Sequence, residues 1–221
     1  MKALYAFGYT LIKTLLKVFF RFRAYGLDNV PRGKAIIAAN HQSYVDPPVV
    51  GSGIREEIWY LAREDVFNLA LFRWLCVKVN SIMIRKRRAD RSALAKVLEK
   101  LAQGKKVLVF PEGTRSCDGE LQAPERGIGL LAHRSGAPVV PAYVSGTFQV
   151  LPRGEAMIHL HPISVSFGPP LLFDERTLKD GARRAYEAFS EKVMDAIARL
   201  KASRERHAVR KPSSHSSSRR A

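Results

Sequence analysis

A histidine and an aspartate five positions apart, His41 and Asp46, directly follow an uninterrupted apolar run at 35–39. Such a run predicts a buried strand, and open α/β sheets place ligands beyond the carboxyl ends of their strands. On one helix this spacing puts the two side chains about 140° apart, so they could meet only if His41 lies in a loop and Asp46 opens the next helix. The pair would then be a general base whose tautomer a carboxylate holds. Pro47 equally fits a simpler interpretation, in which Asp46 only caps a helix.

A second polar segment, 110–116, follows another expected strand and reads FPEGTRS. A strand that runs into Pro-Glu-Gly-Thr is typical of a turn, which is one interpretation. A glycine, a hydroxyl and an arginine within three residues could also bind an oxyanion. The GK[ST] of a P-loop and the GxSxG of a nucleophile elbow are both absent, so no serine or cysteine is marked as a covalent nucleophile. We therefore expect direct attack by a substrate hydroxyl.

Together these segments resemble the glycerolipid acyltransferases, specifically the 1-acyl-sn-glycerol-3-phosphate acyltransferase family. The family motif NHxSxxD stands at 40–46 and the motif FPEGTRS at 110–116. A looser motif, an apolar VPxx strand, stands at 139–143 and is followed by Gly146 and Thr147. The resemblance runs from about Gly26 to Phe173. Two complete motifs in the family's order are a specific signal.

One further family motif departs from its usual form, Ile-Pro-Val-x-Arg. This chain has Ile-Met-Ile-Arg-Lys-Arg-Arg at 82–88, and the family arginine falls on Lys86 between Arg85 and Arg87. A lysine keeps the positive charge but lacks the two-pronged guanidinium. Any of the three could reach substrate, and the run could also be a solvated basic surface.

The resemblance implies a transferase in which His41 takes the proton from the hydroxyl of 1-acyl-glycerol-3-phosphate while Asp46 orients the ring. It implies acyl-CoA or acyl carrier protein as donor, no resident cofactor and no metal. The residues that would hold the acceptor's phosphate are Glu112, Gly113, Thr114 and Arg115, with Arg85, Lys86 and Arg87. The alternatives are a sibling enzyme with a different lyso-lipid acceptor and a basic membrane-surface binding protein without turnover.

The elements that must position these residues alternate between strand-like and helix-like segments. Helices are expected at 90–103 and 124–135, each followed by a glycine, and from Thr177 onward. The expected strands are 35–39, 57–61, 81–85, 106–110, 138–144 and 157–167. The alternation predicts a single α/β domain at 26–200, with a mostly parallel or mixed sheet covered by helices.

An N-terminal segment, 1–25, is expected to form an amphipathic helix in a membrane interface. Its ten uncharged residues, 3–12, are too few to span a bilayer, which needs about 20. On a helix with 100° per residue, six apolar side chains form one stripe, and the opposite side of the helix carries Lys13, Lys17 and Arg21. A helix packed on its own domain is the alternative. The stripe contains Leu4, Phe7, Leu11, Leu15, Val18 and Phe22.

The charge balance, 37 Lys and Arg against 20 Asp and Glu, gives +17 and predicts contact with a polyanion. No nucleic-acid motif is present, so we expect an anionic membrane surface and no specific nucleic acid. Residues 201–221 are basic and end in a Ser, His and Arg stretch, which predicts a disordered tail. Two cysteines without a CxxC fit a reducing compartment, and we expect a peripheral or monotopic protein on the cytoplasmic face of a membrane.

Overall fold

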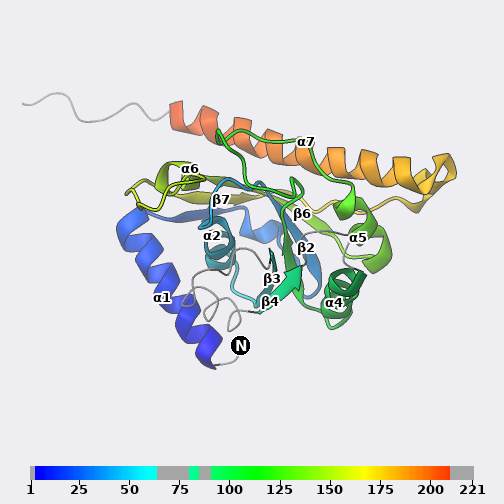
Figure 1. Cartoon of the computed structure of the whole chain (residues 1–221), viewed down its shortest axis with the longest axis horizontal. Helices are drawn as coiled ribbons and strands as arrows, with labels where there is room; N and C mark the ends of the chain where they lie inside the picture. Colours follow the sequence, from blue (N-terminus) through cyan, green and yellow to red (C-terminus); the bar gives the residue numbers. More distant parts are fainter. Residues whose placement is uncertain (1–2, 64–79, 85–90, 210–221) are drawn as a thin grey trace, which may run out of the picture.

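A mixed sheet organises the chain in the computed structural model, which describes residues 3–63, 80–84 and 91–209 (Figure 1). Within these residues it has seven strands, in the order β1-β7-β6-β2-β5-β3-β4. The central strands β6, β2, β5, β3 and β4 are parallel, β7 is antiparallel to β6, and β1 is parallel to β7. The strands are β1 (Arg23–Tyr25), β2 (Ala35–Ala39), β3 (Ile58–Arg63), β4 (Ser81–Ile84), β5 (Lys106–Val109), β6 (Val139–Ser145) and β7 (Ser164–Phe167).

Helices cover both faces of this sheet, because the central strands are apolar on both sides. All five residues of β2 are buried, and successive ones belong to different cores: Ile36 packs toward α4, α5 and α7, whereas Ile37 packs toward α1 and α2. Figure 1 shows the same two groups of helices on opposite sides of the strands. The helices are α1 (Ala3–Phe20), α2 (Asp46–Gly53), α4 (Arg91–Ala102), α5 (Gly127–Ser135), α6 (Thr147–Val150) and α7 (Ala182–Val209), with the 3-10 turns η1 (Leu27–Asn29) and η3 (Glu175–Asp180). The predicted single α/β domain with a mixed sheet is confirmed.

The predicted strand 157–167 is wrong in its first half. Only β7, from Ser164, forms a ladder, because its partner β6 ends at Ser145, directly opposite Ser164. Residues 154–162 therefore have no strand beside them, and they are exposed. Periodicity could not reveal where the neighbouring strand stops.

The predicted boundaries at the two ends of the chain also shift. Helix α1 ends at Phe20, and residues 23–25 form the edge strand β1 instead of continuing the helix to residue 25. At the other end α7 begins at Ala182, after η3, and continues to Val209. The segment predicted to be a disordered tail from residue 201 is thus helical over its first nine residues, and residues 210–221 lie outside the described part.

Helices α5 and α7 pack closely at Gly129, and this contact can be tested. A Cβ added at Gly129 would lie 2.4 Å from the backbone oxygen of Tyr186 on α7. Gly129→Ala should lower the free energy of unfolding by about 1–3 kcal/mol, because neither backbone can yield without moving a helix. Gly127→Ala in the same helix is the matched control, since its Cβ would meet nothing within 4 Å. Urea unfolding followed by circular dichroism measures both; equal stability of the two variants would contradict the close packing.

Candidate active site

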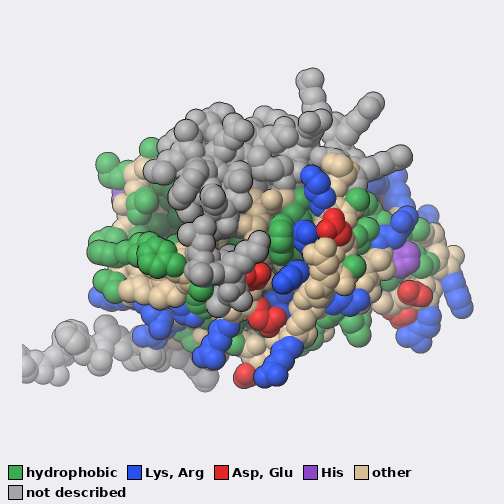
Figure 2. Space-filling view, turned by 90° about the horizontal axis from the view of Figure 1, so that it is seen from below, with side chains coloured by type: hydrophobic (Ala, Val, Ile, Leu, Met, Phe, Trp, Pro, Cys, Tyr) green, Lys and Arg blue, Asp and Glu red, His purple; other side chains and the backbone are tan. Residues whose placement is uncertain are grey.

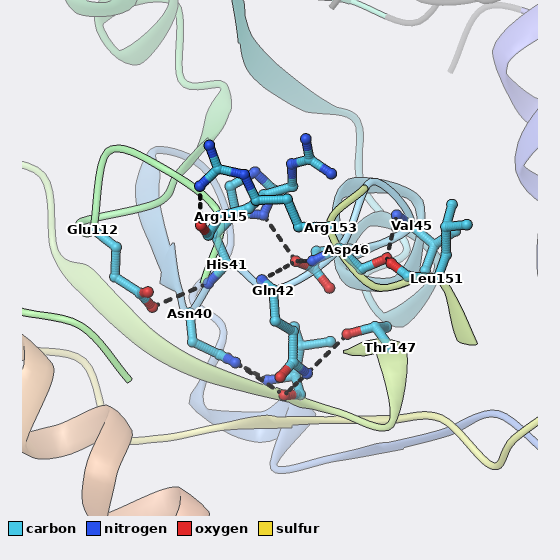
Figure 3. A network of polar contacts seen from close by, with 12 residues as sticks. Asn40, His41, Gln42, Val45, Asp46, Glu112, Arg115, Thr147, Leu151 and Arg153 are labelled. Atoms are coloured by element: carbon cyan, nitrogen blue, oxygen red, sulfur yellow. Dashed lines mark hydrogen bonds and ion pairs between the residues drawn. The ribbon is translucent and has the colours of Figure 1, made fainter. Parts of the chain in front are cut away.

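The two motifs meet at one edge of the sheet. Strands β2 and β5 are parallel neighbours, so the residues that follow Ala39 and Val109 emerge side by side. The loops are joined directly, since the Ser116 backbone N–H donates to the His41 carbonyl oxygen at 2.7 Å. Figure 3 shows the resulting network of polar side chains. The fold thus brings together segments about 70 residues apart.

His41 and Asp46 are in contact. The His41 Nδ1 atom lies 2.8 Å from Asp46 Oδ2, and the Asp46 side chain is fully buried, whereas 18% of the His41 side chain is exposed. Because a carboxylate only accepts, Nδ1 carries the proton and Nε2 is left as the acceptor nitrogen. The pair therefore has the arrangement of a general base whose tautomer is fixed by a carboxylate.

Asp46 does not act as a helix cap here. The N-cap of α2 is Val45, and no side chain caps that helix. The Asp46 carboxylate instead turns back and accepts from the backbone N–H groups of Gln42 and Ser43, at 2.7 and 2.8 Å. The structure thus favours the histidine-orienting interpretation over the capping one.

The plane of the His41 ring is set by Phe110. The two rings stack with their centroids 3.8 Å apart and their planes 13° apart. Phe110 is the first residue after β5, so the second motif both borders the site and orients the imidazole. Stacking on one face and the Asp46 bond at one nitrogen together leave the ring little freedom.

Glu112 contacts the backbone of His41. Its Oε1 accepts from the His41 backbone N–H at 3.1 Å, and the residue is buried. Burial, with a smaller contribution from the nearby Asp46 charge, raises the pKa of Glu112 to about 7, against the lowering effect of backbone hydrogen bonds from His41 and Gln122. A carboxyl group in this position supports the backbone of the histidine loop.

The remaining residues of the second motif form the turn beside this pair. Gly113 has a positive φ of 68°, which favours glycine, and its N–H donates to the Phe110 carbonyl oxygen at 3.1 Å. Thr114 is half-buried. The guanidinium of Arg115 lies over the ring of Tyr44, 3.5 Å from its centroid. This contact holds a cation beside the histidine loop.

The predicted basic contacts Arg85, Lys86 and Arg87 lie outside the described residues. The strand that precedes them, β4, ends at Ile84. Its carboxyl end belongs to the same edge of the sheet as that of β2, with β5 and β3 between them. Their part in substrate binding stays a prediction.

Arg153 is a site residue that the sequence did not indicate. Its Nη1 donates to the Arg115 carbonyl oxygen at 3.2 Å and lies 3.3 Å from the Cys117 Sγ. Figure 3 shows the guanidinium groups of Arg115 and Arg153 on the same side as the His41 ring. No motif marks Arg153, because its place depends on the path of the chain after α6.

A second group of polar side chains holds the histidine loop to β6. Asn40 exchanges two hydrogen bonds with the Val144 backbone, at 3.1 and 2.7 Å. The Gln42 amide donates to the Val144 carbonyl and to the Thr147 hydroxyl, at 3.0 and 2.8 Å. In Figure 3 these side chains point away from the His41 ring. The NHxSxxD motif contained Asn40, but its partners in β6 could be found only in the fold.

The fold and the two joined motifs define an acyltransferase-type domain, and the chain belongs to the Acyltransferase family: the family's sequence model matches residues 21–145, more than half of its 221 residues. Among its relatives is the chloroplastic 1-acyl-sn-glycerol-3-phosphate acyltransferase of Arabidopsis thaliana, 29% identical over 65% of this chain and 41% of the relative. The enzyme of that name from Pseudomonas aeruginosa is 30% identical over 68% of this chain and 59% of the relative.

The fold matches that of a solved member. The crystal structure of the 1-acyl-sn-glycerophosphate (LPA) acyltransferase PlsC from Thermotoga maritima is similar at a TM-score of 0.65 and 25% identity, over 88% of this chain and 84% of that one. The chain spans about two fifths of the length of the first curated relatives that it matches. Among the described residues, no group of three or more His, Cys, Asp and Glu side chains could hold a metal ion.

The buried carboxyl of Glu112 predicts a stability that depends on pH. Because the pKa is raised from 4.5 to about 7, the folded state holds a proton that the unfolded state has released, so the free energy of unfolding falls as pH rises through this window. Glu112→Gln keeps a hydrogen-bond acceptor and removes the titration. Between pH 5 and 8 the free energy of unfolding of the wild type should fall by about 1 kcal/mol or more relative to that of this variant, a figure that includes a reduction for solvent screening.

Urea unfolding at a series of pH values measures this difference directly. All other titrating groups are common to the two proteins and cancel. A stability difference that stays constant from pH 5 to 8 would contradict the raised pKa.

Proposed function

We propose that this protein transfers a fatty acyl group from an acyl thioester to the free hydroxyl of 1-acyl-glycerol-3-phosphate, which makes phosphatidate. The observation that carries the proposal is the fixed His41–Asp46 pair, with its acceptor nitrogen on the same side as two arginines. The printed names of the relatives, which are 1-acyl-sn-glycerol-3-phosphate acyltransferases, support the choice of acceptor.

In the proposed reaction His41 Nε2 takes the proton from the acceptor hydroxyl as its oxygen attacks the thioester carbonyl. The tetrahedral intermediate then expels the thiolate, which receives the proton from the imidazolium. The buried Asp46 charge stabilises that imidazolium and keeps Nδ1 protonated throughout. Base catalysis of this kind supplies about 10²–10⁴ in rate, and positioning supplies much of the rest.

The acceptor's phosphate is assigned to Arg115 and Arg153. Each guanidinium offers several N–H donors, and the two lie near each other on the His41 side. Thr114 and Gly113 border the same turn, and the basic residues 85–87 stay candidates. Glu112 is assigned a supporting role because its Oε1 already accepts from the His41 backbone. The donor is acyl-CoA or acyl carrier protein, and no resident cofactor is required.

A membrane surface is the proposed location, since both lipids reside there. The apolar stripe of α1, which is predicted to contact lipid, is turned toward solvent: Phe7 is 68% and Val18 67% exposed. Leu16, by contrast, packs into the core. Phe22, which the helical pattern placed on that stripe, is buried because the helix has already ended. No described helix is long and apolar enough to cross a bilayer. The cytoplasmic face stays a prediction.

The base pair can be tested by two substitutions. His41→Ala should lower kcat by at least about 10²-fold, because the hydroxyl loses its proton acceptor. Asp46→Asn keeps an oxygen that accepts from Gln42 and Ser43 but removes the charge, so kcat should fall by at least about tenfold. Release of free thiol from an acyl thioester, with lysophosphatidate as acceptor, measures both.

Circular dichroism and urea unfolding show whether the two variants fold. A folded His41→Ala protein with substantial activity would exclude this mechanism. No turnover by the wild type with any lyso-lipid would favour the non-enzymatic membrane-binding alternative, and turnover with another lyso-lipid only would favour a sibling enzyme.

The two arginines can be tested through the acceptor's phosphate. Arg115→Ala and Arg153→Ala should each raise the acceptor KM by about 10- to 150-fold, the range for a lost charge-assisted hydrogen bond, with little change in the thioester KM. Arg184→Ala, an exposed arginine in the first turn of α7, is the matched control. An equal rise in KM for a phosphate-bearing and a phosphate-free acceptor would show that these residues do not bind the phosphate.

A further inference from the structure

An exposed apolar segment, 157–160, lies in the connection between α6 and β7. Met157, Ile158 and Leu160 are 70%, 57% and 72% exposed, so three large apolar side chains point into solvent within four residues. A soluble surface rarely concentrates apolar side chains in this way without a partner. The acyltransferase chemistry makes no use of them.

This apolar tip is fixed next to the exposed stripe of α1. The Ile163 N–H donates to the carbonyl of Phe20, the last residue of α1, at 2.9 Å, and the Arg23 N–H donates to the Ile163 carbonyl at 3.1 Å. In Figure 1 the connection lies beside the C-terminal end of α1, and Figure 2 shows apolar side chains gathered along that side of the molecule. The exposed residues of the stripe are Phe7, Leu11, Leu15 and Val18, and Phe19 beside them is also exposed.

The other end of the connection is fixed to the candidate active site. The Ser43 hydroxyl donates to the Leu151 carbonyl at 2.7 Å, and Arg153 donates to the Arg115 carbonyl. The His159 N–H returns to the Val150 carbonyl at 2.9 Å, which keeps the tip close to α6. One short connection therefore joins the histidine loop, the apolar tip and the end of α1.

We propose that residues 157–160 form a second membrane-inserting element, which enters the same anionic phospholipid surface as the stripe of α1. The inference rests on the proposed membrane location of α1 and adds a second contact with the phospholipid surface, which the helix alone does not provide. Charge supports the choice of lipid, because Arg21, Arg23 and Arg153 are exposed around this region and would lie at the level of anionic headgroups.

A second contact has a consequence for the site. A single interfacial helix can rotate about its own axis, but two separated insertions fix the domain against the bilayer. Arg153 is four residues from Met157, so an extended chain puts it at most about 14 Å from the inserted tip. The tip would thereby hold the phosphate-binding arginines at the depth where the acceptor's headgroup lies.

Tryptophan probes in the full-length chain test this inference. Leu160→Trp should show a blue shift and quenching by brominated lipids with vesicles of phosphatidylcholine and phosphatidylglycerol, after subtraction of the parent's own two tryptophans. Val18→Trp reports the α1 stripe in the same way. Leu172→Trp is the matched control, because Leu172 is 68% exposed but follows Leu171, which pairs with Val139 at the opposite end of β6. The control should show neither change.

The outcomes separate this inference from the location on which it rests. Quenching of the Val18 probe without quenching of the Leu160 probe overturns the second element alone, whereas quenching of neither probe overturns the membrane location as well.

The double variant Ile158→Ser with Leu160→Ser should lower partitioning onto the vesicles by about tenfold or more, and Leu172→Ser should leave it unchanged. Thioester consumption with a short-chain, water-soluble acceptor should be retained by the double variant, so a failure of the acyltransferase assignment would be seen separately. Unchanged partitioning of the double variant would also overturn the inference.

Discussion

The buried carboxylate of Asp46 is the constraint on which the rest of the site depends. A charge with no solvent exposure is stable only if donors surround it, and here two backbone N–H groups and the His41 ring converge on one oxygen. Meeting that requirement forces residues 42 and 43 to wrap around the start of α2. The same wrapping presents His41 beyond the end of β2, so one loop conformation both satisfies the buried carboxylate and places the imidazole.

The position of β2 between β6 and β5 explains why this loop is held so firmly. Each neighbouring strand contributes a hydrogen-bonded connection: Asn40 bonds to the backbone of Val144 at the end of β6, and the Ser116 N–H after β5 bonds to the His41 carbonyl. Phe110 adds the stacking contact from the β5 side. A parallel sheet places such loops at one edge, and hydrogen bonds between them convert that proximity into fixed geometry.

Much of this arrangement could be predicted from sequence because its signals are local. Apolar runs marked β2 and β5, and the two motifs marked His41, Asp46 and Glu112. What escaped prediction depends on distant partners. The direction of the Asp46 carboxylate follows from the fold of its loop, Arg153 reaches the site through an irregular connection, and residues 157–163 have strand-like composition but no strand to pair with. The helical start of the predicted tail belongs to α7, which packs on the core as far as Leu200 and continues as a helix to Val209.

The charges around His41 fit an anionic acceptor. Asp46 is a buried anion, Glu112 is a second carboxyl nearby, and a phosphate would bring further negative charge. Burial raises the pKa of Glu112 to about 7, so near neutral pH this group can hold a proton and avoid repulsion with Asp46 and with an incoming phosphate. Arg115 and Arg153 lie on the His41 side, where they place two positive charges. In the proposed reaction the Asp46 carboxylate serves the base, the Glu112 carboxyl supports the loop, and the two arginines select the substrate.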